Sequence, residues 1–208
     1  MAPKRKTVAK AEEPKTKEPK VAAAAEATAD TAAPAAPDVS EKEVDAAPDK
    51  RAVIKEEVAF RAQDTTLNVV PVMGGKVLCS LTEGGLQYLV AGARASAAVK
   101  AGRYMYEVKI METLPVSDRA WPRGQPKPKQ LLRVGFSAAG ASLALHDEDA
   151  SVFFDSEGFC SAGKARTKTS KPLTKDQVIA VVLNVDPDSP NAHTVSIFRD
   201  GERAGPPQ

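Results

Sequence analysis

The 208-residue sequence is poor in the residues on which disulfide scaffolds, metal sites and many catalytic centres depend. It contains two cysteines, Cys79 and Cys160, and two histidines, His146 and His193. Two cysteines are too few for a disulfide framework and favour a reducing, intracellular compartment. The histidines are far apart and have no second ligand at metal-binding spacing, so we predict no bound metal and no cofactor.

Long apolar runs are also missing. No stretch approaches the roughly 20 apolar residues that a membrane-spanning helix needs, and no apolar segment follows the lysine-rich N-terminus as a secretory signal requires. The acidic residues 147–149 lack the alternate spacing of a calcium-binding loop. The glycine pairs at 74–75 and 84–85 lack the Gly-Lys-Ser/Thr of a phosphate-binding loop. We therefore predict no membrane association, no small-molecule substrate and no catalytic site, that is, a protein that is not an enzyme.

The net charge of +2 conceals two N-terminal regions of opposite sign. Residues 1–20 hold seven lysines and arginines against three glutamates, whereas residues 21–49 hold seven acidic residues against one lysine. Valine is the only aliphatic residue larger than alanine between residues 2 and 50. Such a composition cannot bury enough apolar area to offset the entropy of ordering. We predict a disordered tail over residues 1–50, basic and then acidic, followed by one folded domain over residues 51–208.

The basic part of the tail contains a compact cluster, Lys4, Arg5 and Lys6, directly after Pro3. Short basic clusters of this kind act as nuclear-import signals, although they also arise by chance as solvated charge runs. Its place in an exposed tail favours the import signal, and we predict a nuclear protein.

Three segments predict β-strands. Residues 104–111 (YMYEVKIM) alternate between an apolar face and a more polar one. Residues 178–183 (VIAVVL) are rich in β-branched residues and typical of a strand buried on both faces. Residues 131–137 (LLRVGFS) are the third, and Gly135 permits a close backbone approach there. Because long polar loops join them, we predict an all-β fold, an antiparallel β-sandwich with function in its loops.

Other segments give weaker patterns. We expect a strand over residues 67–72 after a turn at residues 64–66, and a hairpin that pairs residues 76–81 with 86–90 around a Glu-Gly-Gly turn. The alanine-rich residues 91–99 are ambiguous between helix and other structure. A second basic loop is expected to contain four cations, Lys164, Arg166, Lys168 and Lys171.

Four motifs over residues 78–205 resemble those of the SPRY (B30.2-like) family. Residues 102–108 (GRYMYEV) resemble its G-x-x-Y-x-E-V strand, and residues 132–137 (LRVGFS) its R-V-G-W/F-S strand. Residues 176–179 (DQVI) look like its D-V-I, and residues 195–201 (VSIFRDG) like its I-S-F-x-x-N-G hairpin. The resemblance implies a non-catalytic protein-interaction domain. It also implies one or two strands beyond residue 208, so we expect a C-terminally truncated domain.

Within that family, residues 89–99 (LVAGARASAAV) are similar to the W-A-G-x-R-A-S-x-G-V segment of the heterogeneous nuclear ribonucleoprotein U-like family, with Val90 and Ala98 as departures. This likeness implies a role in RNA-associated or chromatin-associated complexes. The second likeness is to the SPRY subunit of histone methyltransferase complexes.

The residues predicted to bind a partner gather in the loop between residues 113 and 130. It places the only tryptophan between two arginines, and tryptophan and arginine dominate interface hot spots. Its candidates are Arg119, Trp121, Arg123, Lys127 and Lys129. The expected partner is a peptide or domain of another protein. The tryptophan is equally compatible with a structural role in which it covers the edge of the sandwich. RNA or DNA is another candidate partner, because the cations can contact phosphates and the tryptophan can stack on a base. Arg94, set among small residues, is predicted either to form a buried bidentate pair or to bind a partner carboxylate.

Overall fold

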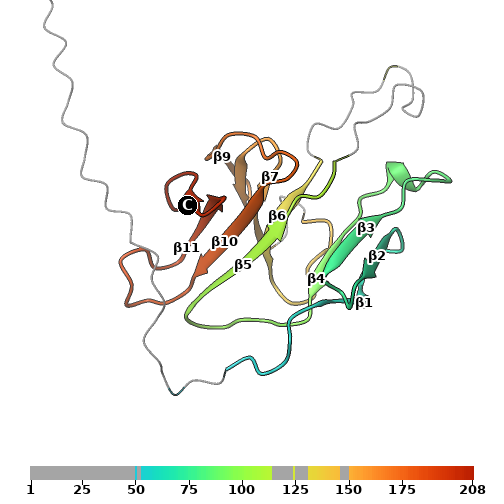
Figure 1. Ribbon diagram of the computed structural model, residues 1–208. Coiled ribbons are helices and arrows are strands. Elements are labelled where there is room, and N and C mark those ends of the chain that lie inside the picture. Colours follow the sequence, from blue (N-terminus) through green and yellow to red (C-terminus); the bar gives the residue numbers. More distant parts are fainter. Residues whose placement is uncertain (1–49, 51–52, 114–123, 125–130, 146–149) are drawn as a thin grey trace, which may run out of the picture. The chain divides into compact units, whose positions relative to one another are not determined.

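The computed structural model describes residues 50, 53–113, 124, 131–145 and 150–208 (Figure 1). The predicted disordered tail and the import candidates Lys4, Arg5 and Lys6 lie outside the described residues, as do His146 and the acidic residues 147–149.

The described part of the chain is all-β, and the strand pairings within it are antiparallel. The predicted antiparallel β-sandwich is therefore confirmed. The strands are β1 (Phe60–Thr65), β2 (Val69–Val72), β3 (Val77–Ser80), β4 (Ala93–Ala95), β5 (Arg103–Lys109), β6 (Arg133–Ser137), β7 (Ser151–Asp155), β8 (Phe159–Ala162), β9 (Ala165–Lys168), β10 (Val178–Asn184), β11 (Thr194–Arg199) and β12 (Glu202–Arg203), with one short 3-10 helix, η1 (Leu86–Tyr88).

One main sheet has the strand order β12-β11-β10-β5. Its central strand β10 lies between β11 and β5 (Figure 1), so residues far apart in sequence become neighbours, such as Val181 and Tyr106. Exposure alternates along β5 as predicted, with Tyr106 half-buried and Glu107 exposed. Beyond β12 the chain continues beside β11, where Gln208 exchanges two backbone hydrogen bonds with Val195.

The second main sheet has the order β6-β7-β8-β9. Gly135 on β6 lies so close to β7 that an added Cβ would stand 2.0 Å from the Val152 carbonyl oxygen. Since such a contact is sterically forbidden, only glycine fits there, and the predicted close approach is confirmed. Alternate residues of these strands face the two sides of the sheet. Phe154 and Cys160 point into the sandwich core, whereas Phe153 lies on the opposite face.

The core joins the two main sheets. Buried side chains from both pack together, namely Ile110, Val134, Phe154, Cys160, Leu173, Ile179, Val181, Val195 and Ile197. Burying one large apolar side chain contributes about 1.5–3 kcal/mol. A polar contact also crosses the sandwich, because the Tyr106 hydroxyl donates a 2.9 Å hydrogen bond to the Gly135 carbonyl. The Tyr106 ring meets Phe136 edge-on, with centroids 5.3 Å apart.

The N-terminal strands correct several predictions. Strand β1 extends to Thr65 and so includes two residues of the turn expected at 64–66, and the next strand starts at Val69 rather than at residue 67. The hairpin predicted between residues 76–81 and 86–90 is wrong: β3 pairs with β2, and residues 86–88 form η1. The reason is the turn between β2 and β3, where Met73, Gly74 and Gly75 all have positive φ angles.

The ambiguous alanine-rich segment is a strand. Ala93 and Ala95 on β4 pair with Thr65 and Phe60 on β1. Alanine favours helix intrinsically, but pairing with a neighbouring strand overrides that preference.

Candidate protein-interaction site

The two ends of the predicted binding loop meet at one place in the second sheet. Leu131 donates its backbone N–H to the Ser156 hydroxyl at 2.8 Å, and Ser156 donates its own N–H to the Leu132 carbonyl at 2.9 Å. Thr113, at the other end of the loop, lines the same pocket as Leu131. We call Thr113, Leu131 and Ser156 the loop base. It ties the loop to the turn between β7 and β8.

The pocket at the loop base has a volume of about 340 Å³. This is at the small end of the range for ligand pockets, which suits one side chain of a partner better than a cofactor. Its walls combine apolar and polar groups, namely Thr113, Leu131, Ser156, Glu157, Phe159, Lys168, Pro172 and Leu173.

Asp155 organises the turn beside this pocket. Its side chain is fully buried, and its Oδ1 accepts backbone hydrogen bonds from Glu157 at 2.9 Å and from Phe159 at 3.0 Å. Its Oδ2 accepts from the Arg166 Nη2 at 2.9 Å. Local side-chain-to-backbone bonds of this type define Asx turns. Asp155 thus both shapes the β7–β8 turn and holds a cation of β9.

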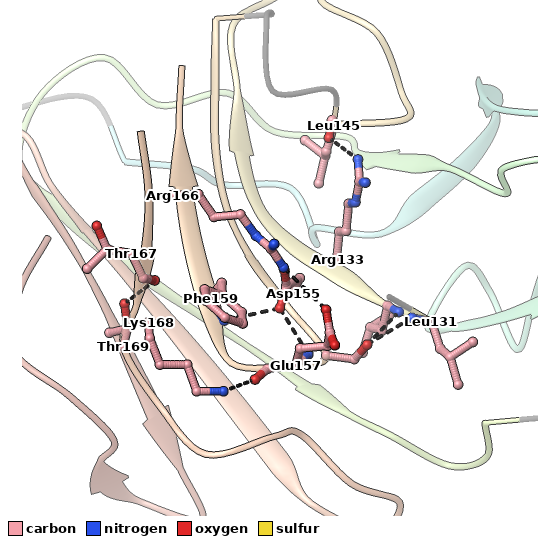
Figure 2. Close-up of polar contacts among 12 residues, drawn as sticks. Leu131, Arg133, Leu145, Asp155, Glu157, Phe159, Arg166, Thr167, Lys168 and Thr169 are labelled. Carbon is pink, nitrogen blue, oxygen red and sulfur yellow. Dashed lines mark hydrogen bonds and ion pairs between the residues drawn. The ribbon is translucent and has the colours of Figure 1, made fainter. Parts of the chain in front are cut away.

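Two cations of β9 lie over one aromatic ring (Figure 2). The Arg166 guanidinium carbon is 4.0 Å from the centroid of the Phe159 ring, and the Lys168 Nζ is 4.7 Å from it. Arg166 also pairs with Glu157 at 3.3 Å, and Lys168 donates to the Glu157 carbonyl. The hydrogen bond to Asp155 raises the pKa of Arg166 above its ordinary value. These contacts restrict both cations while leaving Arg166 40% exposed.

Arg133 on β6 lies on the same face of this sheet. Its guanidinium carbon is 5.0 Å from the centroid of Phe153, and its Nη1 donates to the Leu145 carbonyl at 2.6 Å (Figure 2). We call Arg133, Arg166 and Lys168 the cationic face. Cations held over aromatic rings interact with the ring electrons and retain their charge for other partners.

Arg94 is directed into the protein. Its Nη2 donates to the Ala141 carbonyl at 2.6 Å and to the Ser137 hydroxyl at 3.2 Å. Its Nε is buried without a hydrogen-bond partner. Among the described residues its acceptors are thus a main-chain carbonyl and a hydroxyl, and both the buried bidentate pair and the binding of a partner carboxylate stay predictions.

The other predicted partner-binding residues lie outside the described residues, namely Arg119, Trp121, Arg123, Lys127 and Lys129. The structure indicates two further candidate partner-binding residues, Arg166 and Lys168, which the sequence analysis placed in a loop. That placement is wrong, because Arg166 and Lys168 lie on strand β9. The alternation of cations with small residues after a turn glycine was the available signal. No sequence signal indicated that both cations contact Phe159 or that Arg166 contacts Asp155, because these contacts join residues on separate strands.

Burial, and secondarily the Asp155 carboxylate, raise the pKa of the Cys160 thiol to about 11, so it stays protonated at neutral pH. His193 lies in the loop between β10 and β11. Among the described residues, no three histidine, cysteine or acidic side chains are placed to hold a metal. No helix in those ranges is both long and apolar enough to span a bilayer.

A scan against models of known protein families finds none that matches this chain.

Proposed function

We propose that this chain is a SPRY-like, non-catalytic interaction module that binds a protein partner through the loop at residues 113–130 and the neighbouring loops. The proposal places it in a nuclear protein of the heterogeneous nuclear ribonucleoprotein U-like kind, acting in RNA-associated or chromatin-associated complexes. The partner surface is acidic, because the loop and the adjoining sheet face are both rich in cations.

The positions of the resemblance motifs support the SPRY-like assignment. The G-x-x-Y-x-E-V motif coincides with β5 and the R-V-G-F-S motif with β6. The D-x-V-I motif leads into β10, and the last motif covers β11 and the turn at Asp200 and Gly201. Motifs of one family are expected to coincide with the strands of one shared sandwich.

The single observation that carries the binding proposal is the loop base. Both ends of the loop meet at one small pocket, and the cationic face adjoins it through Lys168. Thr113 and Leu131 thus fix the two ends of the loop beside the β7–β8 turn, and binding residues are often carried by loops whose ends a rigid scaffold positions. The arrangement suits docking rather than turnover.

A differential pull-down tests the proposal. The double variant Arg119→Glu/Trp121→Ala is compared with the wild type and with Lys100→Glu, an exposed residue at the opposite end of β5. Nuclear extract is treated with nuclease so that partners bridged by nucleic acid are removed. We expect the loop variant to lose its partners by more than about tenfold, as for hot-spot residues, and Lys100→Glu to retain them. Unchanged capture by a folded loop variant contradicts the loop assignment.

Direct binding of RNA or DNA is the second candidate function, motivated by the basic loop and by the cations stacked on Phe159. It requires an affinity that falls steeply with salt, because bound cations release counterions from the phosphates. Titrating a labelled single-stranded oligonucleotide at low and high salt measures this. No binding at low salt excludes this candidate.

A role as the SPRY subunit of a histone methyltransferase complex is a third candidate, carried only by the second likeness in the sequence. The nuclease-resistant partners of the pull-down separate it from the ribonucleoprotein assignment. Enrichment of methyltransferase subunits favours it, whereas enrichment of RNA-processing proteins favours the first proposal.

A further inference from the structure

Strand β9 is the outer strand of its sheet, with β8 on one side only. All four of its residues are exposed. Thr169, just beyond it, donates its N–H toward β8, to the Gly158 carbonyl. Since antiparallel strands alternate between inward and outward backbone groups, Thr167 faces β8 while Arg166 and Lys168 face outward. The amides of Arg166 and Lys168 donate to no described residue, so the edge offers unpaired hydrogen-bonding groups.

The charge on this edge has one sign. Residues 164–171 contain four cations, Lys164, Arg166, Lys168 and Lys171, and no carboxylate. Of the nearby carboxylates, Asp155 is fully buried and Glu157 is half-buried, and both pair with Arg166. The exposed edge is therefore positive, and Phe159 and Asp155 limit the movement of its two central cations.

We propose that the outer edge of β9 accepts an extended acidic segment of a partner protein as an additional strand. The backbone of that segment pairs with the outward groups of Arg166 and Lys168. Its acidic side chains, at alternate positions, lie on the same face as the side chains of these two cations. Strand addition of this kind draws affinity from main-chain hydrogen bonds and specificity from alternate side chains.

The pocket at the loop base extends this site. Lys168 both ends β9 and lines the pocket, together with Phe159 and Leu173. A side chain of the added segment just beyond Lys168 reaches this mixed apolar and polar hollow. The pocket thus supplies a side-chain preference that a bare sheet edge lacks.

Lysine on an edge strand is also a common protection against edge-to-edge aggregation. That effect fits the present proposal, because it disfavours one particular occupant, a second copy of β9. Pairing two copies would bring their cations together, and like charges across strands are destabilising. An acidic strand reverses the sign of this interaction.

This inference shares with the proposed function only the premise that the module binds protein. It concerns β9 and not the residues of the 113–130 loop. The loop variant Arg119→Glu/Trp121→Ala is therefore expected to keep binding at β9, which separates the failure of one proposal from the failure of the other.

The first test measures fluorescence anisotropy of a short labelled peptide of alternating glutamate and threonine. The variant Lys164→Glu/Lys168→Glu reverses two exposed charges without removing a partner of buried Asp155. Its matched control is Lys100→Glu/Lys109→Glu, which makes the same charge change on and beside β5 of the other sheet. We expect the first variant to lose more than about tenfold in affinity, since it opposes like charges, and the control to lose less than about threefold, through long-range screened charge alone.

The second test separates strand addition from simple charge attraction. Lys168→Pro removes an outward-facing N–H, which an edge strand tolerates, while Lys168→Ala removes only the side chain. We expect the proline variant to bind about threefold to tenfold more weakly than the alanine variant, the loss due to one hydrogen bond. A peptide of alternating glutamate and proline has equal charge but lacks half of the amides, and we expect it to bind more weakly than the threonine peptide.

Four results overturn the proposal. The first is equal affinity of the wild type for the threonine and proline peptides, and the second is equal affinity of Lys168→Pro and Lys168→Ala for the threonine peptide. Either result shows that main-chain hydrogen bonds do not contribute to binding. The third is displacement of the peptide by a single-stranded oligonucleotide whose own binding is lost in Lys164→Glu/Lys168→Glu, which assigns the edge to nucleic acid. The fourth is dimerisation of the wild type that Lys168→Pro abolishes in sedimentation experiments, which assigns it to a second copy.

Discussion

Replacing Asp155 with alanine removes the acceptor for two backbone donors and for Arg166 in one step. The two donors are the N–H groups of Glu157 and Phe159, at 2.9 and 3.0 Å from Oδ1. An orphaned buried donor costs about 1–3 kcal/mol. Glu157 and Phe159 are half-buried, so water restores part of this loss. We therefore expect a loss of about 2–4 kcal/mol in the free energy of unfolding, while the ion pair adds less, because its Arg166 side chain is 40% exposed to water.

For a domain of this size, that loss lowers the melting temperature by about 4–16 °C. The assay is urea and thermal unfolding followed by circular dichroism. Asp155→Asn is the matched control, because it keeps an oxygen in the place of Oδ1 and loses only the charge and the Oδ2 acceptor of Arg166. We expect it to lose less than half as much as Asp155→Ala. Equal losses in the two variants, or no loss in either, would refute the view that turn geometry sets the role of Asp155.

Four further predictions concern the core and the sheet contacts. Burial raises the pKa of the Cys160 thiol to about 11, from 9.0 in the unfolded chain. The neutral thiol therefore contributes its full stabilisation below about pH 9, and this contribution is lost as the pH rises toward 11. In Cys160→Ala, we expect the unfolding free energy to depend less on pH between about pH 9 and about pH 11. Iodoacetamide at pH 8 should modify exposed Cys79 at least about tenfold faster than Cys160, measured by mass spectrometry. Gly135→Ala should abolish soluble expression, because its Cβ meets the Val152 carbonyl oxygen at 2.0 Å, whereas a folded, stable variant contradicts that contact. Tyr106→Phe should lower the unfolding free energy by about 1 kcal/mol, because it removes the hydrogen bond to the Gly135 carbonyl. Since burial raises the pKa of Tyr106, the variant should also lack the tyrosine that titrates last in an absorbance titration above pH 10.

The strands that dominate the core could be predicted from local pattern. Residues 178–183 carry enough β-branched side chains to require burial on both faces, and β10 is buried on both. Alternation over residues 104–111 gave the correct orientation of β5. In both segments, the side chains that fit a pleated sheet are also those that need burial, so local preference and tertiary structure agree.

The sequence-based predictions that the structure contradicts have a different cause. Residues 76–81 are followed by a credible turn at Gly84 and Gly85, yet β3 pairs backward with β2. Either pairing satisfies the local pattern, and the choice depends on Gly75, which lies against β1, where an added Cβ would stand 2.2 Å from the Phe60 carbonyl oxygen. Similarly, residues 164–171 appear only as a basic stretch, because an exposed edge strand has no apolar face to mark it.

By itself, the sequence determined the all-β class, the main core strands and the need for glycine at position 135, because these follow from side-chain shape and periodicity within a few residues. Only the tertiary structure decided which strands became neighbours, that the two ends of the 113–130 loop line one pocket with Ser156, and that Arg166 contacts both Phe159 and buried Asp155. These contacts join residues on different strands. Their energies depend on distances that no local pattern contains.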